Sequence, residues 1–408
     1  MPPIKAARSL RALDGLVFFL ADVQDGLGPY LSIYLLVHCA WEPSQVGVAM
    51  AAMVIGTLLA QLPAGALIDR THRKRWVVVT AAGVVAASCI GMSLMHALPG
   101  IVVAQAMIGA AAAVMPPAIA GISLGLVGRA HFARRTGRNE ALNHSGNVTA
   151  AVLSGVVGTV FGYIAIFHLV AAVALASAVC CLLIRESDID HARAREAPEQ
   201  PSNADAPTES AIAVLWRTPR LMAFIAAMFL FHLGNAAMLP LVGQKVSIGK
   251  PDSAAALISA CIVVAQVVMV PVALLAAHGA ERWGRKPVFL IAFLVLPIRG
   301  LLYTQSVNPA FLIAVQVLDG IGAGIYGVVA VLMVADLARG TGRFNLALGA
   351  TALALGLGTA CSNLLAGVIA SATSYNTTFA TLSGIAASGL LWFLLAVPET
   401  RVQAEAAA

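Results

Sequence analysis

The chain has 408 residues, of which 60% are hydrophobic and only 11% are charged. A soluble domain needs about a quarter charged residues to cover its surface, so this composition excludes a water-soluble globular protein. The formal net charge is +6, yet 22 of the 25 lysines and arginines fall on one side of the predicted membrane spans. The charge therefore indicates topology rather than a nucleic-acid partner, and it places both termini in the cytoplasm by the positive-inside rule.

Twelve apolar runs are long enough to cross a bilayer, which takes about 20 helical residues. Lipid offers the backbone no hydrogen-bond partners, so each run is predicted to be a helix. The first run contains aspartates and no small-residue cleavage site, so we expect a retained helix rather than a signal peptide. The predicted spans of this all-α membrane protein are 12–37, 44–68, 76–95, 100–127, 141–163, 166–184, 219–243, 253–278, 287–306, 309–335, 344–370 and 376–397.

The polar stretch between the sixth and seventh spans divides the chain. It is rich in acidic residues and interrupted by prolines, and such a segment cannot bury a core. A short surface helix is predicted at 209–216, just before the seventh span. We predict an N-terminal six-helix bundle over 1–184, a cytoplasmic linker over 185–217 and a C-terminal six-helix bundle over 218–408.

Landmarks repeat between the two halves at almost one offset. Pro240 follows Pro29 by 211 positions, and Gln316 follows Gln105 by the same interval. Two basic motifs, at 65–75 and 281–286, lie 212 positions apart between apolar runs. Two tandem halves of similar orientation are typical of a transporter with a central site between them. Residues kept in both halves are explained by the shared scaffold. A polar residue found in only one half needs another explanation, such as a specific binding or coupling site.

The motifs and the six-plus-six pattern resemble the major facilitator superfamily over the whole chain. The first motif fits the family pattern Gly-x-Leu-(Ala/Ser)-Asp-Arg-x-Gly-Arg-(Arg/Lys), with His72 in place of its second glycine, and the second motif has Glu281 in place of the aspartate. The resemblance implies two pseudo-symmetric bundles around a central cavity, with the two motifs forming a cytosolic gate. Alternatively, the charges of the motifs serve only to anchor the topology. The candidate gate residues are Gly65, Asp69, Arg70, Arg73, Lys74, Glu281, Arg282, Gly284, Arg285 and Lys286.

The chain departs from the family's proton-coupled drug antiporters in two places. Gln105 stands where many of them carry an arginine four residues before a glycine. The fifth span has no Gly-Pro between Gly146 and Gly158, although its small residues still permit close helix packing. Both the coupling and the direction of transport are therefore open.

Four ionisable residues at membrane depth have no ionisable counterpart in the other half: Asp22, Asp25, Arg299 and Asp319. Such a group costs at least about 2.5–3.5 kcal/mol and indicates function by default. The resemblance places helices one, four, seven and ten around the cavity, so the three aspartates are candidate proton-coupling residues. Asp22 and Asp25, one turn apart, cannot both ionise cheaply, which favours Asp25 as the coupling site. Alternatively, Asp22 bonds a neighbouring helix and Asp25 caps the bend before Pro29.

Arg299 and Asp319 lie at comparable depth on consecutive antiparallel helices. They are predicted to form a buried ion pair, which is either structural or part of an anion site. His232 and Asn235, one turn apart, are candidates for binding substrate or relaying a proton, or alternatively for packing. The candidate substrate-cavity residues are Tyr30, Tyr34, Gln105, His232, Asn235, Gln316 and Tyr326.

The sequence shows no metal-ligand spacing, nucleotide loop or nucleophile–base motif, so neither an enzyme nor a metal or cofactor site is predicted. A channel would need a continuous polar stripe through the bundle, whereas the polar residues here cluster near mid-depth. A signalling or scaffold protein would normally carry an obvious soluble effector module. We predict a secondary active transporter of the bacterial inner membrane, a monomer that exports a small organic molecule by alternating access with proton coupling. The alternatives are a proton-coupled importer of an organic acid or iron-chelating metabolite, or a uniporter.

Overall fold

The computed structural model describes residues 7–23, 27–71, 73–190, 218–249, 251–338 and 344–401, and in these ranges the chain forms helices and no strand. The predicted surface helix at 209–216 lies outside them. The first half contains α1 (Ala7–Val23), α2 (Gly28–Val37), α3 (Pro43–Arg70), α4 (Lys74–Leu94), α5 (Leu98–Val127), α6 (Arg129–Phe161), α7 (Tyr163–Leu183) and a 3-10 turn, η2 (Glu186–Asp188). The second half contains α9 (Pro219–Asn235), α10 (Met238–Ser247), α11 (Pro251–Arg282), α12 (Arg285–Gln305), α13 (Pro309–Leu337), α14 (Phe344–Ala372) and α15 (Tyr375–Ala396).

Ten spans within the described residues are long and apolar enough to cross a membrane. The two other predicted spans correspond to α1 with α2 and to α6. Large apolar side chains face outward; Leu59, Leu94 and Leu395 are each about three-quarters exposed. So much exposed apolar surface suits lipid and not water. The protein is therefore an all-helical, multi-pass membrane protein.

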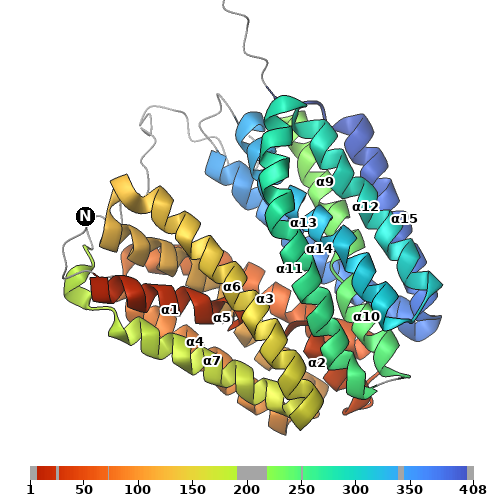
Figure 1. The fold of residues 1–408 in the computed structure, drawn as a ribbon, viewed down its shortest axis with the longest axis horizontal. Helices are drawn as coiled ribbons and strands as arrows, with labels where there is room; N and C mark the ends of the chain where they lie inside the picture. Colours follow the sequence, from red (N-terminus) through yellow and green to blue (C-terminus); the bar gives the residue numbers. More distant parts are fainter. Residues whose placement is uncertain are drawn as a thin grey trace, which may run out of the picture. The chain divides into compact units, whose positions relative to one another are not determined.

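The chain separates into two compact units that repeat one pattern of helix packing. One unit comprises Met1–Trp41, Val48–Glu199 and Ser247–Ser259, and the other comprises Glu42–Gly47, Gln200–Val246 and Ala260–Ala408. In the first, α1 packs on α6 and α7, and α4 packs on α5 and α7 (Figure 1). In the second, α9 packs on α14 and α15, and α12 packs on α13 and α15. The same four pairings thus recur in chain order.

A proline lies near the start of α2 and near the start of α10, at equivalent places in the two halves. Pro240 has no N–H, and its ring excludes the carbonyl of Ala236, four residues earlier, so a break separates α9 from α10. The N–H of Ala237 donates instead to Ser362 Oγ on α14, at 3.1 Å. Pro29 stands at the equivalent position, just after the interval between α1 and α2. Ala236 and Ala237 therefore interrupt the helix predicted over 219–243, although Pro219–Ser247 remains one membrane span. Residues 24–26 lie outside the described ranges, so a continuous helix over 12–37 stays a prediction.

The charged stretch at 128–140, which was predicted to be a loop, is mostly the start of α6. Gly128 alone, with a φ of 70°, separates α5 from α6. Asp14 of α1 accepts a bond from Arg135 at 2.7 Å and two from Arg138, at 3.0 and 2.7 Å. These charge-assisted bonds pair both arginines with Asp14 along a helix face, although Nη2 of Arg135 is buried without a partner among the described residues, so no loop is needed to carry the two charges into water.

Glycines allow close helix contact at equivalent places in the two halves. A Cβ on Gly109 of α5 would collide with the carbonyl oxygen of Met53 on α3. Likewise, a Cβ on Gly320 of α13 would collide with the carbonyl oxygen of Ala265 on α11. Small residues at such crossings let membrane helices pack backbone to backbone.

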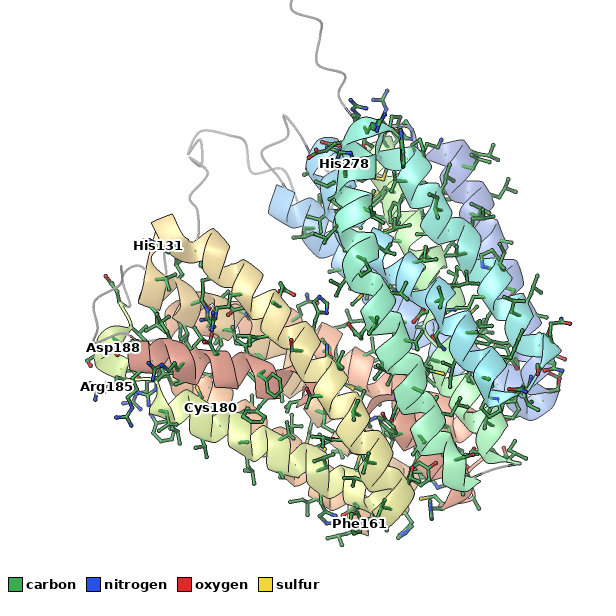
Figure 2. All side chains as sticks on the ribbon, in the orientation of Figure 1. His131, Phe161, Cys180, Arg185, Asp188 and His278 are labelled. Carbon is green, nitrogen blue, oxygen red and sulfur yellow. The ribbon has the colours of Figure 1, made fainter. Side chains whose placement is uncertain are left out.

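The residues that follow α7 fold back onto the start of α1. Ser9 Oγ donates to the Asp188 carboxylate at 2.6 Å and accepts the N–H of Arg185 at 3.1 Å. Figure 2 shows Arg185 and Asp188 together at this end of the first unit. The first residues of the predicted linker are therefore packed against the first unit.

Candidate functional site

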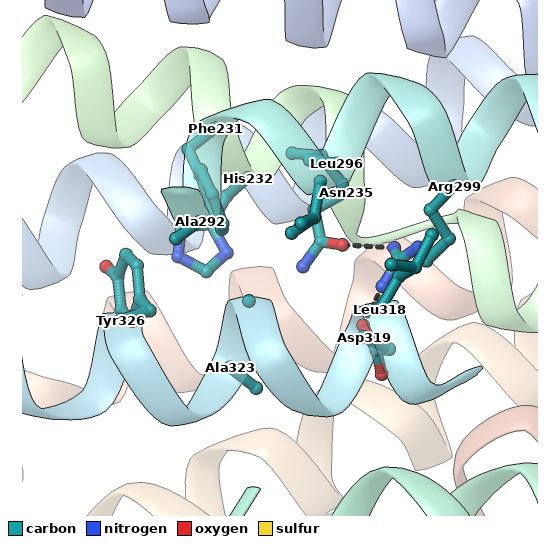
Figure 3. Close-up of a pocket in the computed structure, with 12 residues that line it drawn as sticks. Phe231, His232, Asn235, Ala292, Leu296, Arg299, Leu318, Asp319, Ala323 and Tyr326 are labelled. Carbon is teal, nitrogen blue, oxygen red and sulfur yellow. Dashed lines mark hydrogen bonds and ion pairs between the residues drawn. The ribbon is translucent and has the colours of Figure 1, made fainter. Parts of the chain in front are cut away.

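A pocket in the second unit brings together polar residues from α9, α12 and α13 (Figure 3). We call it the Arg299 pocket. Its volume is about 110 Å³, which accommodates several waters or one end of a small molecule but not a whole drug-sized ligand. Its polar lining residues are His232, Asn235, Arg299, Asp319 and Tyr326.

Arg299 is the centre of the polar network and is only 4% exposed. Its guanidinium forms an ion pair with Asp319 and donates to Asn235 Oδ1 (Figure 3). The same guanidinium lies 3.3 Å from the sulfur of Met238 and 5.9 Å from the ring centroid of Tyr303. The carboxylate neutralises a charge that would otherwise be very costly at this depth.

Aromatic rings form the end of the pocket away from Arg299. The His232 ring meets Tyr326 edge to face, with centroids 4.9 Å apart, and Phe231 stacks on Tyr326 at 5.3 Å. The cluster continues through Phe293, 5.0 Å from Phe231. Nε2 of His232 is buried and has no hydrogen-bond partner among the described residues.

Neither predicted cavity tyrosine of α2 lines the Arg299 pocket. The hydroxyl of Tyr30 lies 2.8 Å from Ser259 Oγ, within the first unit. Tyr34 is 1% exposed and packs its ring on Phe167, with centroids 4.7 Å apart. Their assignment to a substrate cavity stays a prediction.

The paired glutamines are both 1% exposed and also lie away from this pocket. Gln316 Nε2 donates to the hydroxyl of Tyr303 at 2.8 Å. Oε1 of Gln105 is buried without a partner in the described part of the chain. The repeat therefore preserves the residue type and its burial but not its hydrogen bond.

Several predicted site groups lie outside what the structure describes. Asp25 is one, and for Asp22, Gly65, Asp69 and Arg70 only the helical backbone is described. Their roles in coupling and gating stay predictions. In the part of the chain that is described, no three His, Cys, Asp or Glu residues are placed to hold a metal ion.

The second motif forms a cap on the N-terminus of α12. Glu399 accepts the backbone N–H groups of Arg285 and Lys286, at 2.9 and 3.0 Å, where a helix has unpaired donors. Gly284 has a φ of 106°, and a Cβ there would collide with this carboxylate. Burial alone would raise the pKa of Glu399, but these two N–H groups and those of Thr400 and Arg401 outweigh it and hold the pKa below its ordinary value.

Basic side chains of both motifs bind helix ends within their own units. Lys286 donates to the carbonyl of Leu394 near the end of α15, at 2.7 Å. Arg75, 211 positions earlier, donates to the carbonyl of Leu182 near the end of α7, at 2.8 Å. Lys74 is buried and donates to carbonyls at the end of α3, and Arg285 pairs with Asp336 at 3.2 Å. Arg73, Glu281 and Arg282 are exposed.

Sequence reasoning missed three carboxylates that organise these regions: Asp14, Asp336 and Glu399. Glu399 could have been singled out from the sequence, because it stands at the end of the second half as Glu186 stands at the end of the first. Asp14 could not have been, because its arginine partners are 121 and 124 positions away.

Comparisons with known proteins agree with this fold. The profile of the Major Facilitator Superfamily matches residues 15–279 and 251–408. Uncharacterized MFS-type transporters of two Mycobacterium tuberculosis strains, CDC 1551 / Oshkosh and ATCC 25618 / H37Rv, are each 48% identical over 393 residues, covering 96% of this chain and 94% of the relative.

Solved transporters share the fold at low identity. The nucleoside transporter NupG superposes with a TM-score of 0.80 at 14% identity, covering 95% of this chain and 98% of its own. The D-xylose-proton symporter gives a TM-score of 0.70, also at 14% identity, with 98% and 99% coverage. The chain therefore belongs to the major facilitator superfamily and is an integral membrane transporter of small molecules, not an enzyme.

Proposed function

We propose that this transporter couples movement of its substrate to protons, and that Asp319 carries a proton. The observation that supports the proposal is the ion pair of Asp319 with Arg299 in a pocket that also holds His232 and Asn235. An ionisable pair at membrane depth that lines a cavity is costly to keep for structure alone. The Asp319 side chain is 26% exposed, so the carboxylate is not sealed inside the protein.

Protonation of Asp319 provides a two-state element of the kind that transport needs. With the carboxylate charged, Arg299 holds α12 and α13 together across the pocket. With the carboxylate neutral, that attraction is lost. The charged and neutral states of the pair then differ by a few kcal/mol in how strongly they hold α12 and α13 together. Asp25 and Asp22 remain proposed as further proton sites on the first helix.

The direction that we propose is export, across the bacterial inner membrane, with both termini in the cytoplasm. Export rests on the family resemblance alone, whereas the orientation rests on the lysine and arginine distribution. Import of an organic acid remains the second candidate, because Arg299 provides a guanidinium suited to a carboxylate.

The test is proton flux in liposomes that contain the purified protein and an internal pH dye. Pooled metabolites and drugs are added outside or loaded inside, so that the two directions are measured separately. We expect a substrate-triggered pH change that Asp319→Asn abolishes and that Glu140→Gln, an exposed control on α6, leaves intact. Substrate movement without a pH change, or an unchanged pH response in Asp319→Asn, would reject coupling at Asp319. Asp25→Asn is measured beside them.

A further inference from the structure

The unpaired polar atoms of the Arg299 pocket are mainly hydrogen-bond donors. Nε of Arg299 is buried without a partner among the described residues, as is Nε2 of His232. Asn235 accepts from Arg299 through its oxygen, which leaves its NH2 group for the pocket (Figure 3). Buried donors without acceptors cost free energy, so a ligand that supplies oxygens would be stabilised here.

The charges of the pocket point to the same ligand. Arg299 and Asp319 are its charged lining residues, and they cancel. A proton on Asp319 would leave the guanidinium with neutral partners, namely the Asn235 oxygen, the Met238 sulfur and the uncharged carboxyl, and with no negative charge to balance it. Breaking a buried pair in this way is strongly unfavourable unless another anion takes the place of the carboxylate. Proton binding and anion binding at this pocket therefore favour each other.

Other titratable groups near the pair come from each neighbouring helix. His232 lies on α9 and Tyr326 on α13. Tyr303, on α12, lies under the guanidinium, and Cys261, on α11, is close enough to Tyr303 to interact with it. Lys245, on α10, donates to the carbonyl of Tyr303 at 2.7 Å but does not line the pocket. Arg299 is therefore the fixed positive charge of the lining, and the pocket balances one negative charge and not two.

We propose that the Arg299 pocket binds the carboxylate of a small organic monoacid together with a proton on Asp319. The guanidinium presents a planar fork that matches a carboxylate, and the cavity admits that group but not a whole substrate. Phe231, Val295 and Leu318 offer apolar surface to the carbon body. The inference rests on the proposed proton coupling at Asp319 and favours its second candidate, import of an organic acid, because an acid that binds together with a proton moves in the same direction as that proton.

Binding to the purified full-length protein in detergent tests this inference without transport. Benzoate and acetate are titrated against thermal stability, with benzamide and acetamide as neutral controls of the same shape. In Asp319→Asn, which mimics the protonated aspartate, we expect benzoate to bind about tenfold more tightly than in the wild type at neutral pH. In the wild type we expect tighter benzoate binding as the pH falls, with uptake of about one proton per benzoate bound.

The arginine is tested in the same assay. Asp319→Asn with Arg299→Gln should lose benzoate binding, and Asp319→Asn with Arg299→Lys should weaken it, whereas Arg220→Gln, on the exposed start of α9, should change nothing. The proposal is overturned if neither acid stabilises Asp319→Asn, if amides stabilise it equally, or if binding survives Arg299→Gln. If these results accompany proton flux that depends on Asp319, only the carboxylate inference fails. If that flux is also absent, the proposed function fails as well.

Discussion

The two units share one scaffold but differ at the place where the second has its pocket. Both pair their helices in the same way, have a proline near the start of a short helix and bring two helices together at a glycine. His232, Arg299, Asp319 and Tyr326 line the pocket of the second unit. The residues 211 positions earlier are Ala21, Ser88, Ile108 and Met115, all buried. At these four positions the ionisable side chains therefore belong to the second unit, while the first unit has buried side chains that do not ionise.

The largest expected effect comes from making the second unit resemble the first. Asp319→Leu alone should destabilise the protein by about 3–5 kcal/mol, because it leaves Arg299 buried without its counter-charge. Asp319→Leu with Arg299→Met should recover most of that loss, since both charges are removed together. Equilibrium unfolding in mixed micelles measures the difference. Equal destabilisation of the single and double variants would show that the stability lost in Asp319→Leu does not come from the unpaired charge of Arg299.

A smaller effect tests the shared scaffold. Gly109→Ala and Gly320→Ala should each cost about 1–3 kcal/mol, because a Cβ at either position meets a backbone carbonyl that cannot move alone. Matched controls lie on helices of the same units: Gly83 and Gly327 have open space where a Cβ would be. Their replacement by alanine should stabilise the protein by about 0.5–1 kcal/mol. A large loss of stability in only one half would show that the two halves share their helix arrangement but not the tight packing at these glycines.

Glu399→Gln tests the cap on α12; at the equivalent place in the first unit, Arg75 near the start of α4 pairs with Glu186 at 2.9 Å. We expect a loss of about 1 kcal/mol at neutral pH, near the low end for a cap because the side chain is exposed and water screens it. The folded pKa of Glu399 is lowered, so its stabilisation is full above the ordinary glutamate value and is lost as the pH falls through the folded value. Thermal unfolding of the two proteins should therefore converge in acid; a constant difference would contradict the cap.

The smallest effect concerns the helix break. Ser362→Ala removes the acceptor for the Ala237 N–H and should cost about 0.6 kcal/mol, typical of hydrogen bonds between membrane helices. Hydrogen exchange at Ala237 should rise in the variant. Ser388→Ala, at an exposed serine on α15, is the control. Unchanged exchange would mean that the break does not depend on α14.

Much of this organisation is visible in the sequence because it depends on local chemistry. Pro240 marks a helix break and the paired glycines mark helix crossings, and Pro29 repeats Pro240 at the same offset as the glycines. The membrane spans follow from hydropathy, although α6 begins well before its predicted start because the charged residues at that end stay helical. Depth in the membrane also singled out Arg299 and Asp319, since ionisable groups there are rare.

The composition, the repeat and the two motifs by themselves determined the class of protein, the family and the twelve spans. The sequence also predicted that Arg299 and Asp319 meet, but only the tertiary structure decided which other polar residues join them. His232 and Asn235 are separated from Arg299 by more than sixty positions, yet they share its pocket, whereas Gln316, three residues from Asp319, turns to Tyr303 instead. The physical reason is that hydropathy and propensity act along the chain, while a hydrogen bond or ion pair depends on how separate helices rotate against each other.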